Sequence, residues 1–109
     1  MVTIKPQRTQ VVFRAIADPT RREILNLLRE RPLAVGEIAS NFRTSRPAVS
    51  RHLRLLKSAG LITVHERGTA NICELNALPL RAVNEWLGDY RAYWNETLRG
   101  LKRYLEVKP

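Results

Sequence analysis

At 109 residues, 44% of them hydrophobic, the chain holds enough apolar side chains for one compact domain, which excludes a purely disordered protein. Its 19 Lys and Arg residues, against 10 Asp and Glu, give a formal net charge of +9 and indicate a polyanionic partner, above all nucleic acid. The single cysteine excludes an internal disulfide, and the lack of any apolar run of about 18 residues predicts a cytoplasmic protein with no membrane partner.

Two amphipathic helices are predicted near the N-terminus. Apolar residues recur at helical spacing over about 7–16. Asp18 followed by Pro19 is typical of a helix start, with the aspartate as N-cap and the proline in the first turn. The second helix then covers about 20–29, and Pro32 follows its end.

A helix-turn-helix comes next. Apolar residues at three- and four-residue steps over 35–42 predict a short third helix, although Ala34 offers no side chain to cap it. After a short joint, Ser45 is a good N-cap for a fourth helix, which Gly60 ends by supplying a left-handed conformation. Two short helices with so tight a joint are typical of a helix-turn-helix.

A hairpin and a long helix complete the chain. Residues 61–65 and 71–75 are predicted to be antiparallel strands joined by a turn at 67–69, and this hairpin is the wing. After the hairpin, apolar residues at three- or four-residue steps predict one long amphipathic helix, with Gly88 and Gly100 as its weak points.

The expected fold is therefore mainly α with a small β-hairpin, in the α+β class: a winged helix-turn-helix with a long C-terminal dimerisation helix. Residues 1–109 are expected to form a single winged-helix domain. Within it, 7–76 form the helix-turn-helix body and the wing, and 77–109 form the C-terminal helix. No internal repeat or flexible linker divides the chain.

The predicted fourth helix has one apolar and one basic face. Val49, Leu53 and Leu56 share a narrow face that anchors the helix, and the opposite face is free. Five basic residues and no acidic residue lie within 41–57, as expected of a helix that enters the major groove of duplex DNA. The residues expected to contact DNA, on this helix, at its start and on the hairpin, are Arg43, Thr44, Ser45, Arg46, Pro47, Ser50, Arg51, Arg54, Arg67 and Gly68.

Different roles are expected within this set. Arg46, Ser50 and Arg51 are expected to read base edges in the major groove. The hydroxyls of Thr44 and Ser45, with the free amides of the helix start, are expected to hold a phosphate. Arg67 at the hairpin tip either enters the minor groove or grips a phosphate, or it serves solubility alone, as charges at hairpin tips often do.

Three segments resemble those of a known family. Ala17–Leu25 (ADPTRREIL), Val49–Leu53 (VSRHL) and Ala59–Ile62 (AGLI), together with the Arg67-Gly68 hairpin, resemble the ArsR/SmtB transcriptional repressors. The similarity extends over nearly the whole chain. It implies a homodimeric repressor that binds a palindromic operator and uses its first and last helices as the dimer interface.

The metal site of that family is missing from this sequence. Its members are known chiefly as metal or metalloid sensors with a cysteine pair on the third helix, but 33–42 hold no Cys or His. The last helix offers Glu85, Asp89 and Glu96 as candidate ligands, without the thiolate or imidazole that selects such metals. We therefore expect no metal and no cofactor. The inducing signal stays open between an organic ligand, a partner protein and autoregulated abundance.

The histidines and the cysteine have ordinary explanations. His52, in the predicted fourth helix, and His65, in the wing, do not complete a metal site by themselves. His52 is expected to pack, to bond to the backbone or to touch a phosphate. Cys73, in a predicted strand, is expected to be a small core residue instead of a redox switch.

The C-terminal helix predicts a partner surface. It is rich in aromatic residues, and more than one of its faces is apolar. A helix of about 25 residues spans roughly 37 Å, which is longer than a small winged body, so part of it is expected to pack on a second subunit in addition to capping the monomer core. The expected dimer-interface residues are Val11, Val12, Val83, Leu87, Tyr90, Trp94, Leu98 and Leu101.

Three other functions fit less well. An enzyme would need a nucleophile motif or a glycine-rich phosphate loop, so we expect no catalytic residue. The main alternative is a basic winged helix that binds RNA or any nucleic acid, but RNA readers expose aromatic stacking residues, which the predicted reading face lacks. A winged helix for protein contacts alone would carry acidic or apolar residues in place of Arg46, Arg51 and Arg54. The sequence thus predicts a sequence-specific, duplex-DNA-binding transcriptional regulator.

Overall fold

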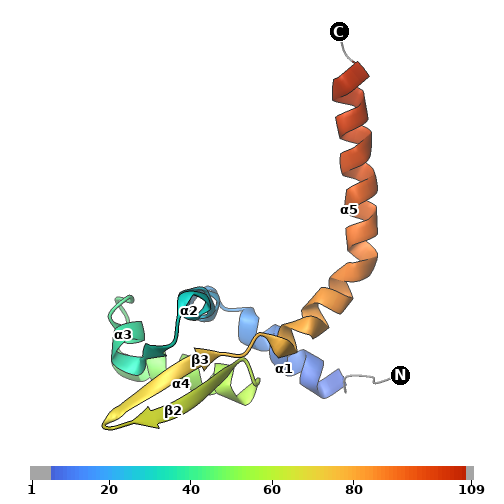
Figure 1. Ribbon diagram of the computed structural model, residues 1–109. Helices are drawn as coiled ribbons and strands as arrows, with labels where there is room; N and C mark the ends of the chain where they lie inside the picture. Colours follow the sequence, from blue (N-terminus) through green and yellow to red (C-terminus); the bar gives the residue numbers. More distant parts are fainter. Residues whose placement is uncertain (1–5, 108–109) are drawn as a thin grey trace.

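The computed structural model describes residues 6–107, so residues 1–5 and 108–109 of the predicted 1–109 domain, with the end of the predicted 77–109 helix, lie outside the described residues. Short helices and a small sheet form a body from which one long helix extends (Figure 1). This arrangement confirms the predicted winged helix-turn-helix. The elements in chain order are α1 (Pro6–Ile16), α2 (Pro19–Glu30), β1 (Leu33–Ala34), α3 (Val35–Ala39), α4 (Arg46–Ser58), β2 (Ile62–Arg67), β3 (Ala70–Leu75), a 3₁₀ turn η1 (Leu78–Leu80) and α5 (Arg81–Val107).

The longer helices begin and end where local chemistry predicts. At the start of α2, Asp18 Oδ2 accepts a hydrogen bond from the Arg21 N–H at 3.1 Å. At the start of α4, Ser45 Oγ accepts one from the Ala48 N–H at 3.3 Å. Gly60, with a φ of +77°, turns the chain out of α4. Both predicted N-caps and the glycine stop are confirmed.

The third helix, α3, is shorter than predicted. It ends at Ala39 instead of Phe42, because the N–H groups of Asn41 and Phe42 bond to carbonyls three residues back and close the chain into tight turns. The start of α3 lacks a side-chain cap at Ala34, as predicted. Glu37 compensates, since its Oε1 accepts a hydrogen bond from the Ala34 N–H at 3.0 Å.

The wing differs from the prediction in its turn. The last pair of the β2–β3 ladder is Arg67 opposite Ala70, so the loop is only Gly68-Thr69, and Gly68 has a φ of +61°. The predicted three-residue turn at 67–69 is therefore wrong, because Arg67 stays in the ladder. A third strand, β1, was not predicted. It pairs antiparallel with β3 to give the sheet order β1-β3-β2, and its two residues are too few to show a strand periodicity.

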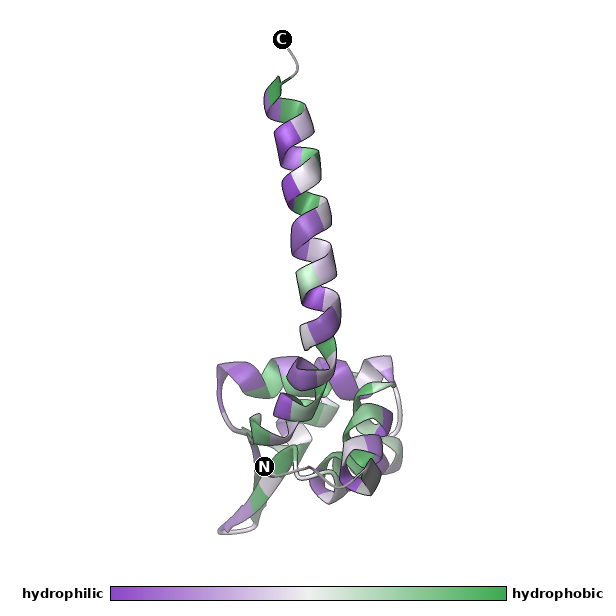
Figure 2. Cartoon of the chain, turned by 90° about the vertical axis from the view of Figure 1, so that its right-hand side faces the viewer, coloured by the Kyte–Doolittle hydropathy of each residue, from purple (hydrophilic) through white to green (hydrophobic). Residues whose placement is uncertain are grey.

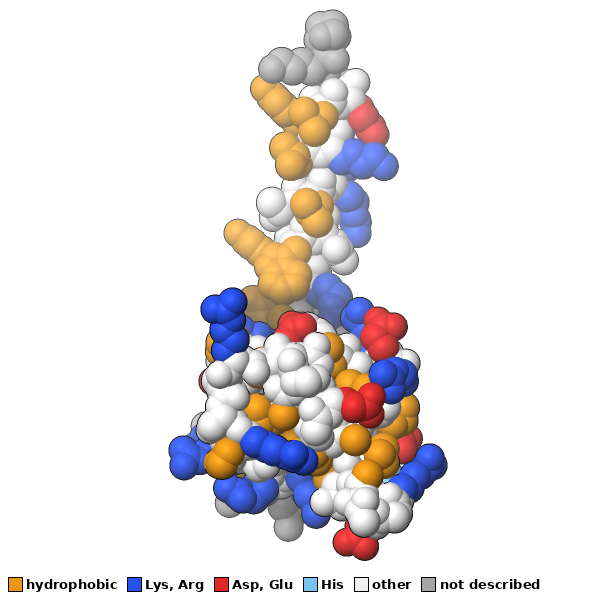
Figure 3. Space-filling model, turned by 90° about the vertical axis from the view of Figure 1, so that its left-hand side faces the viewer, with side chains coloured by type: hydrophobic (Ala, Val, Ile, Leu, Met, Phe, Trp, Pro, Cys, Tyr) orange, Lys and Arg blue, Asp and Glu red, His pale blue; other side chains and the backbone are white. Residues whose placement is uncertain are grey.

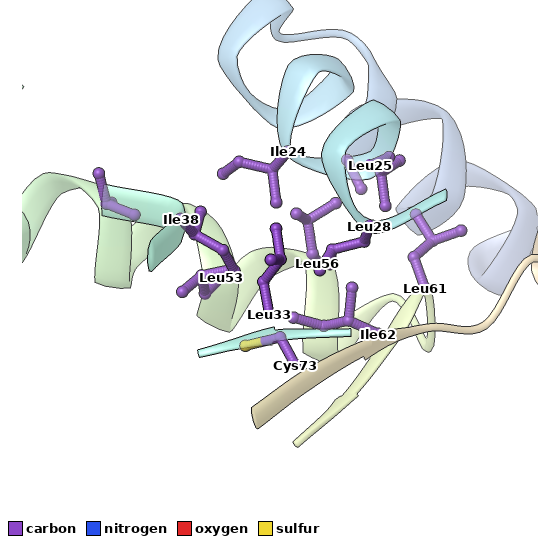
Figure 4. Packing of buried hydrophobic residues seen from close by; sticks show 12 residues of the cluster. Ile24, Leu25, Leu28, Leu33, Ile38, Leu53, Leu56, Leu61, Ile62 and Cys73 are labelled. Carbon is purple, nitrogen blue, oxygen red and sulfur yellow. The ribbon is translucent and has the colours of Figure 1, made fainter. Parts of the chain in front are cut away.

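One hydrophobic core joins the helices to the sheet. Ile24 of α2, Ile38 of α3 and Leu56 of α4 are fully buried, and Cys73 of β3 belongs to the same cluster. Figure 4 shows these side chains gathered between the helices and the strands. Because each element of the helix-turn-helix contributes to this core, α4 is held against α2, α3 and the sheet.

The last helix, α5, projects from the body. Its 27 residues correspond to a length of about 40 Å, and only Ala82, near its start, is buried. Figures 1 and 2 show α5 leaving the body after its first turns, with hydrophobic and hydrophilic residues mixed along its whole length. The molecule measures 63 × 40 × 21 Å, and the long axis reflects this projection.

Candidate nucleic-acid interface

The second helix of the helix-turn-helix, α4, buries an apolar face and exposes a basic one. Val49, Leu53 and Leu56 are all buried, which confirms the predicted inner face. Arg51 and Arg54 are exposed. Lys and Arg side chains stand out around the body in Figure 3. The cationic side of α4 therefore faces solvent, where a polyanion has access to it.

The start of α4 offers fewer amides for a phosphate than the sequence suggested. Pro47 has no N–H, and the Ala48 N–H already donates to Ser45 Oγ. Of the first three amides of α4, the Arg46 N–H is therefore the one left for a phosphate. Thr44 and Ser45 are exposed beside it, and each hydroxyl still has a hydrogen to donate. One amide and two hydroxyls are thus brought together at this helix end.

The Arg46 side chain lies back over α3. A Cβ added to Gly36 would lie 3.7 Å from Arg46 Nη2, so the guanidinium rests beside the first turn of α3. Arg46 is nevertheless exposed, as are Arg43 before α4 and Arg51 one turn further on, whereas Ser50 is half-buried. The Arg46 guanidinium thus lies beside α3 while the residue stays exposed to solvent.

The wing places Arg67 and Gly68 together at its tip, both exposed. Closer to the body, His65 Nε2 lies 3.5 Å from Glu74 Oε2 and 3.2 Å from Thr63 Oγ1. The imidazole is therefore engaged by neighbours on its own strand and on the adjacent one. The wing offers a basic tip on a hydrogen-bonded hairpin.

His52 has partners that the sequence did not predict. Its Nδ1 lies 3.2 Å from Arg21 Nη1 and 3.9 Å from Asp18 Oδ2, and only 20% of the side chain is exposed. Both partners belong to the start of α2. The Arg21 N–H, which bonds to the Asp18 carboxylate, lowers the pKa of that carboxyl below its ordinary value of 3.8. Arg21 was missed because no local pattern connects it to a residue 31 positions away.

The donor groups do not assemble into a metal centre. Among residues 6–107, no group of three or more His, Cys, Asp or Glu side chains is close enough together to hold a metal ion. Burial raises the pKa of the Cys73 thiol, which disfavours the thiolate that binds metals. The candidate carboxylate ligands on α5 are exposed: Glu85, Asp89 and Glu96. Carboxylate oxygens are poor ligands for the soft metals that the ArsR/SmtB sensors bind.

An apolar stripe runs along α5 outside the body. In Figure 3 the hydrophobic side chains of the projecting helix gather on one side, and Lys and Arg side chains lie on the other. No helix in the described part of the chain combines the length and the apolar content needed to cross a membrane. The large exposed side chains of the stripe are Trp86, Tyr90, Tyr93, Trp94, Leu98, Leu101, Tyr104 and Leu105.

The predicted dimer-interface residues fall into two groups. Val12 is buried within the chain, and Val83 and Leu87 are half-buried, so these side chains already pack on their own body. The others remain exposed: Val11, Tyr90, Trp94, Leu98 and Leu101.

Comparisons with known proteins agree with this geometry. The family model described as "Bacterial regulatory protein, arsR family" matches residues 18–64, from the cap of α2 into β2. The chain is similar to the transcriptional repressor SdpR of Bacillus subtilis, with 42% identity over 76 residues that cover 70% of this chain and 84% of that protein. It is also similar to the HTH-type transcriptional regulator Rv2034 of Mycobacterium tuberculosis, with 38% identity over 94 residues that cover 86% of this chain and 85% of that protein.

A solved structure shares the fold. The crystal structure of the ArsR family transcriptional regulator RHA00566 matches with a TM-score of 0.77 and 32% sequence identity. The match covers 86% of this chain and 97% of that one. The similarity therefore extends beyond the helix-turn-helix to most of the molecule.

Proposed function

This chain belongs to the ArsR family of bacterial regulatory proteins and is a DNA-binding transcriptional regulator, and we propose that it acts as a homodimeric repressor on a palindromic operator. The observation that carries the proposal is the exposed basic face of α4, on a helix whose apolar face is anchored in the core. An α-helix of this kind fits the major groove of B-DNA.

Each part of the interface has a proposed task. Arg51 and Arg46 read base edges, because a guanidinium bonds to guanine with two parallel hydrogen bonds. Thr44 and Ser45 hold a phosphate at the start of α4 and so set its register on the duplex. Arg67, at the tip of the wing, enters the minor groove next to the site that α4 occupies. The remaining proposed contacts are Arg43, Pro47, Ser50, Arg54 and Gly68.

The dimer is proposed from the exposed stripe of α5. Trp94 is 46% exposed and Leu98 is 61% exposed in the single chain, and leaving a row of such side chains in water is unfavourable. A second copy that packs its own stripe there, with Val11 of α1 at the edge, removes this apolar surface from water. Two-fold symmetry then presents two copies of α4 to two half-sites, which is why the operator is expected to be palindromic.

Repression without a metal signal completes the proposal. The relative SdpR is named as a transcriptional repressor, and we transfer that direction of regulation to this chain. Binding at the promoter then acts by excluding polymerase, with no catalytic step. The donor groups of residues 6–107 supply no site for a soft metal, so we propose that metal does not control release from DNA.

The direct test is a binding titration with the purified protein. Its affinity is compared for a duplex from upstream of its own gene, an unrelated duplex of equal length and an RNA of matched sequence, over a range of salt concentrations and with either zinc or a chelator. Affinity falls with salt in any case, since phosphate contacts release counterions. Selective binding of the upstream duplex that is unchanged by zinc is expected. Equal affinity for all three probes, or release by zinc, would contradict the proposal.

A further inference from the structure

One side chain connects three helices. Arg21, in the first turn of α2, donates from Nε to the Ala15 carbonyl at 2.6 Å and from Nη2 to the Arg14 carbonyl at 3.0 Å, both at the end of α1. Its third nitrogen, Nη1, lies 3.2 Å from His52 Nδ1 on α4. All three nitrogens of the guanidinium are therefore engaged, two on one helix and one on another.

The chemistry of each contact suits a rigid connection. The last carbonyls of a helix carry partial negative charge, so a cation there is stabilised, even though the Arg14 carbonyl also accepts from the Ala17 N–H at 3.3 Å. The planar guanidinium holds its N–H groups in a fixed fork, which defines the angle between the groups that it joins. Because Arg21 has only donors, His52 accepts at Nδ1 and carries its hydrogen on Nε2. The Asp18 carboxylate lies at the same corner, where its Oδ2 accepts from the Arg21 N–H at 3.1 Å and its charge attracts the Arg21 guanidinium.

Helices α1 and α4 make few other contacts with each other. Helix α1 packs chiefly on α5 and α2, whereas α4 packs on α2, α3 and β2. The polar bridge Arg21–His52 is thus a direct link between the helix that runs with α5 and the helix that carries the basic face.

We infer that Arg21 is a positioning residue that sets the direction of α4 relative to α1 by holding His52. This inference rests on the proposed function, because the α1–α4 angle controls the separation of the two recognition helices only in a homodimer. Tight binding to a duplex with two half-sites then requires the Arg21–His52 bridge, whereas binding to a duplex with one half-site does not. The role differs from that of a DNA contact, since all three guanidinium nitrogens of Arg21 are engaged within the chain.

The angle is tested first within one chain, so that the result does not depend on dimerisation. Spin labels are attached at Gln10→Cys on α1 and Lys57→Cys on α4, both exposed positions, and the labelled chain is diluted into excess unlabelled chain. Buried Cys73 is left in place. The distance distribution between the labels is measured by pulsed electron paramagnetic resonance. We expect it to broaden or shift in Arg21→Gln and in His52→Leu.

Two variants serve as matched controls. Arg22→Gln removes the same charge from the adjacent residue, whose Nη1 donates to the Ile16 carbonyl of α1 at 2.9 Å. His52→Asn keeps an acceptor close to the position of Nδ1. Both are expected to retain the wild-type distribution. Unchanged distances in Arg21→Gln and His52→Leu, with folding checked by circular dichroism, would overturn the inference.

The second arm measures DNA affinity. The wild-type protein selects a duplex from a random pool, and shortened duplexes retain either both half-sites or one. Arg21→Gln and His52→Leu are expected to bind the two-site duplex about 2- to 30-fold more weakly and the one-site duplex as the wild type does. Equal losses on both duplexes would overturn the positioning role. A monomeric wild-type protein with equal affinity for both duplexes would instead refute the homodimer, and the spin-label distances would still decide whether Arg21 sets the angle.

Discussion

Phe13 of α1 meets Trp86 of α5 edge to face, with ring centroids 5.7 Å apart and an interplanar angle of 80°. Such aromatic pairs contribute about 0.5–1.5 kcal/mol beyond the area that they bury. We therefore predict a coupling of this size in a double-mutant cycle of Phe13→Leu and Trp86→Leu. The free energy of unfolding is measured in urea at one protein concentration, because dimerisation would add to the apparent stability.

A second cycle controls for the general effect of losing an aromatic ring on α5. Tyr93 lies on the same helix but is 70% exposed. The cycle of Phe13→Leu with Tyr93→Leu is expected to show a coupling near zero. If both cycles gave the same value, the contact between the rings would not be what joins α1 to the start of α5.

Substitutions on α4 should separate base reading from phosphate contact. Arg51→Ala and Arg46→Ala are each predicted to weaken binding of the selected duplex by about 1–3 kcal/mol and to relax the preference for one base pair. Arg43→Ala, before the helix, should weaken binding about equally on all sequences and reduce its salt dependence. Affinities are measured on the selected duplex and on its single-base variants.

An arginine away from the basic face tests whether these losses are specific. Arg29, exposed in the last turn of α2, carries the same charge, and Arg29→Ala is expected to change affinity little on any duplex. Equal losses on every sequence from Arg51→Ala would contradict the assignment of Arg51 as a base-reading residue.

Low pH should lower the stability of the folded protein by protonating Asp18. The pKa of this carboxyl is lowered in the folded state, so its charge adds stability at pH values above its ordinary pKa of 3.8, and this stability is lost as the pH falls through the lowered value. Asp18→Asn keeps a good N-cap but removes the charge. The wild type is predicted to be more stable than the variant by about 0.3–1 kcal/mol at pH 6.

The difference between the two proteins should shrink below about pH 3.8 and vanish once Asp18 is protonated in both the folded and the unfolded states. Urea unfolding of both proteins between pH 2 and pH 6 measures it. A constant difference over this range would show that the charge of Asp18 does not stabilise α2.

Cys73 should resist thiol reagents in the folded protein. The thiol is fully buried and its pKa is raised by burial, so both access and the reactive thiolate are lacking. We predict that a disulfide reagent modifies Cys73 only on unfolding, whereas a cysteine introduced by Lys57→Cys reacts at once. Mild peroxide should leave DNA affinity unchanged. Rapid modification of the native wild type would instead favour a redox switch.

Local chemistry made much of the fold predictable. The caps Asp18 and Ser45, the stop at Gly60 and the apolar face of α4 each depend on residues a few positions apart, and all were found where the sequence placed them. The errors arose where pairing with residues distant in the sequence determines the local structure. Arg67 stays in a ladder with β3, and the strand β1 exists only because β3 lies beside it.

The same distinction applies to the candidate sites. Helical periodicity places both Val11 and Val12 on the apolar side of the first helix, but it does not show which of them packs on its own chain. In the structure Val12 is the one that is buried there. The bridge between Arg21 and His52 joins residues 31 positions apart and has no periodic signature. Charge, by contrast, needs no tertiary contact to be recognised, so the basic face of α4 was visible in the sequence.

The stripe of α5 gives the sharpest test of the dimer. Trp94→Glu places a charge in the middle of the stripe, where a partner would have to bury it, and such central aromatic residues often contribute about 2 kcal/mol or more to an interface. We predict a wild-type dimer and a Trp94→Glu monomer by light scattering at micromolar concentration. The variant should also bind the two-site duplex far more weakly, because each half-site must then be occupied independently.

Asn95→Glu is the matched control for this test. It adds the same charge at the next residue, about 100° around the helix on the polar side, so it should remain dimeric and bind DNA nearly as the wild type does. The comparison separates the position of the charge from its sign, which matters for a protein that binds a polyanion. If both variants had the wild-type mass, or if the wild type were itself a monomer, the stripe would not be a homodimer interface.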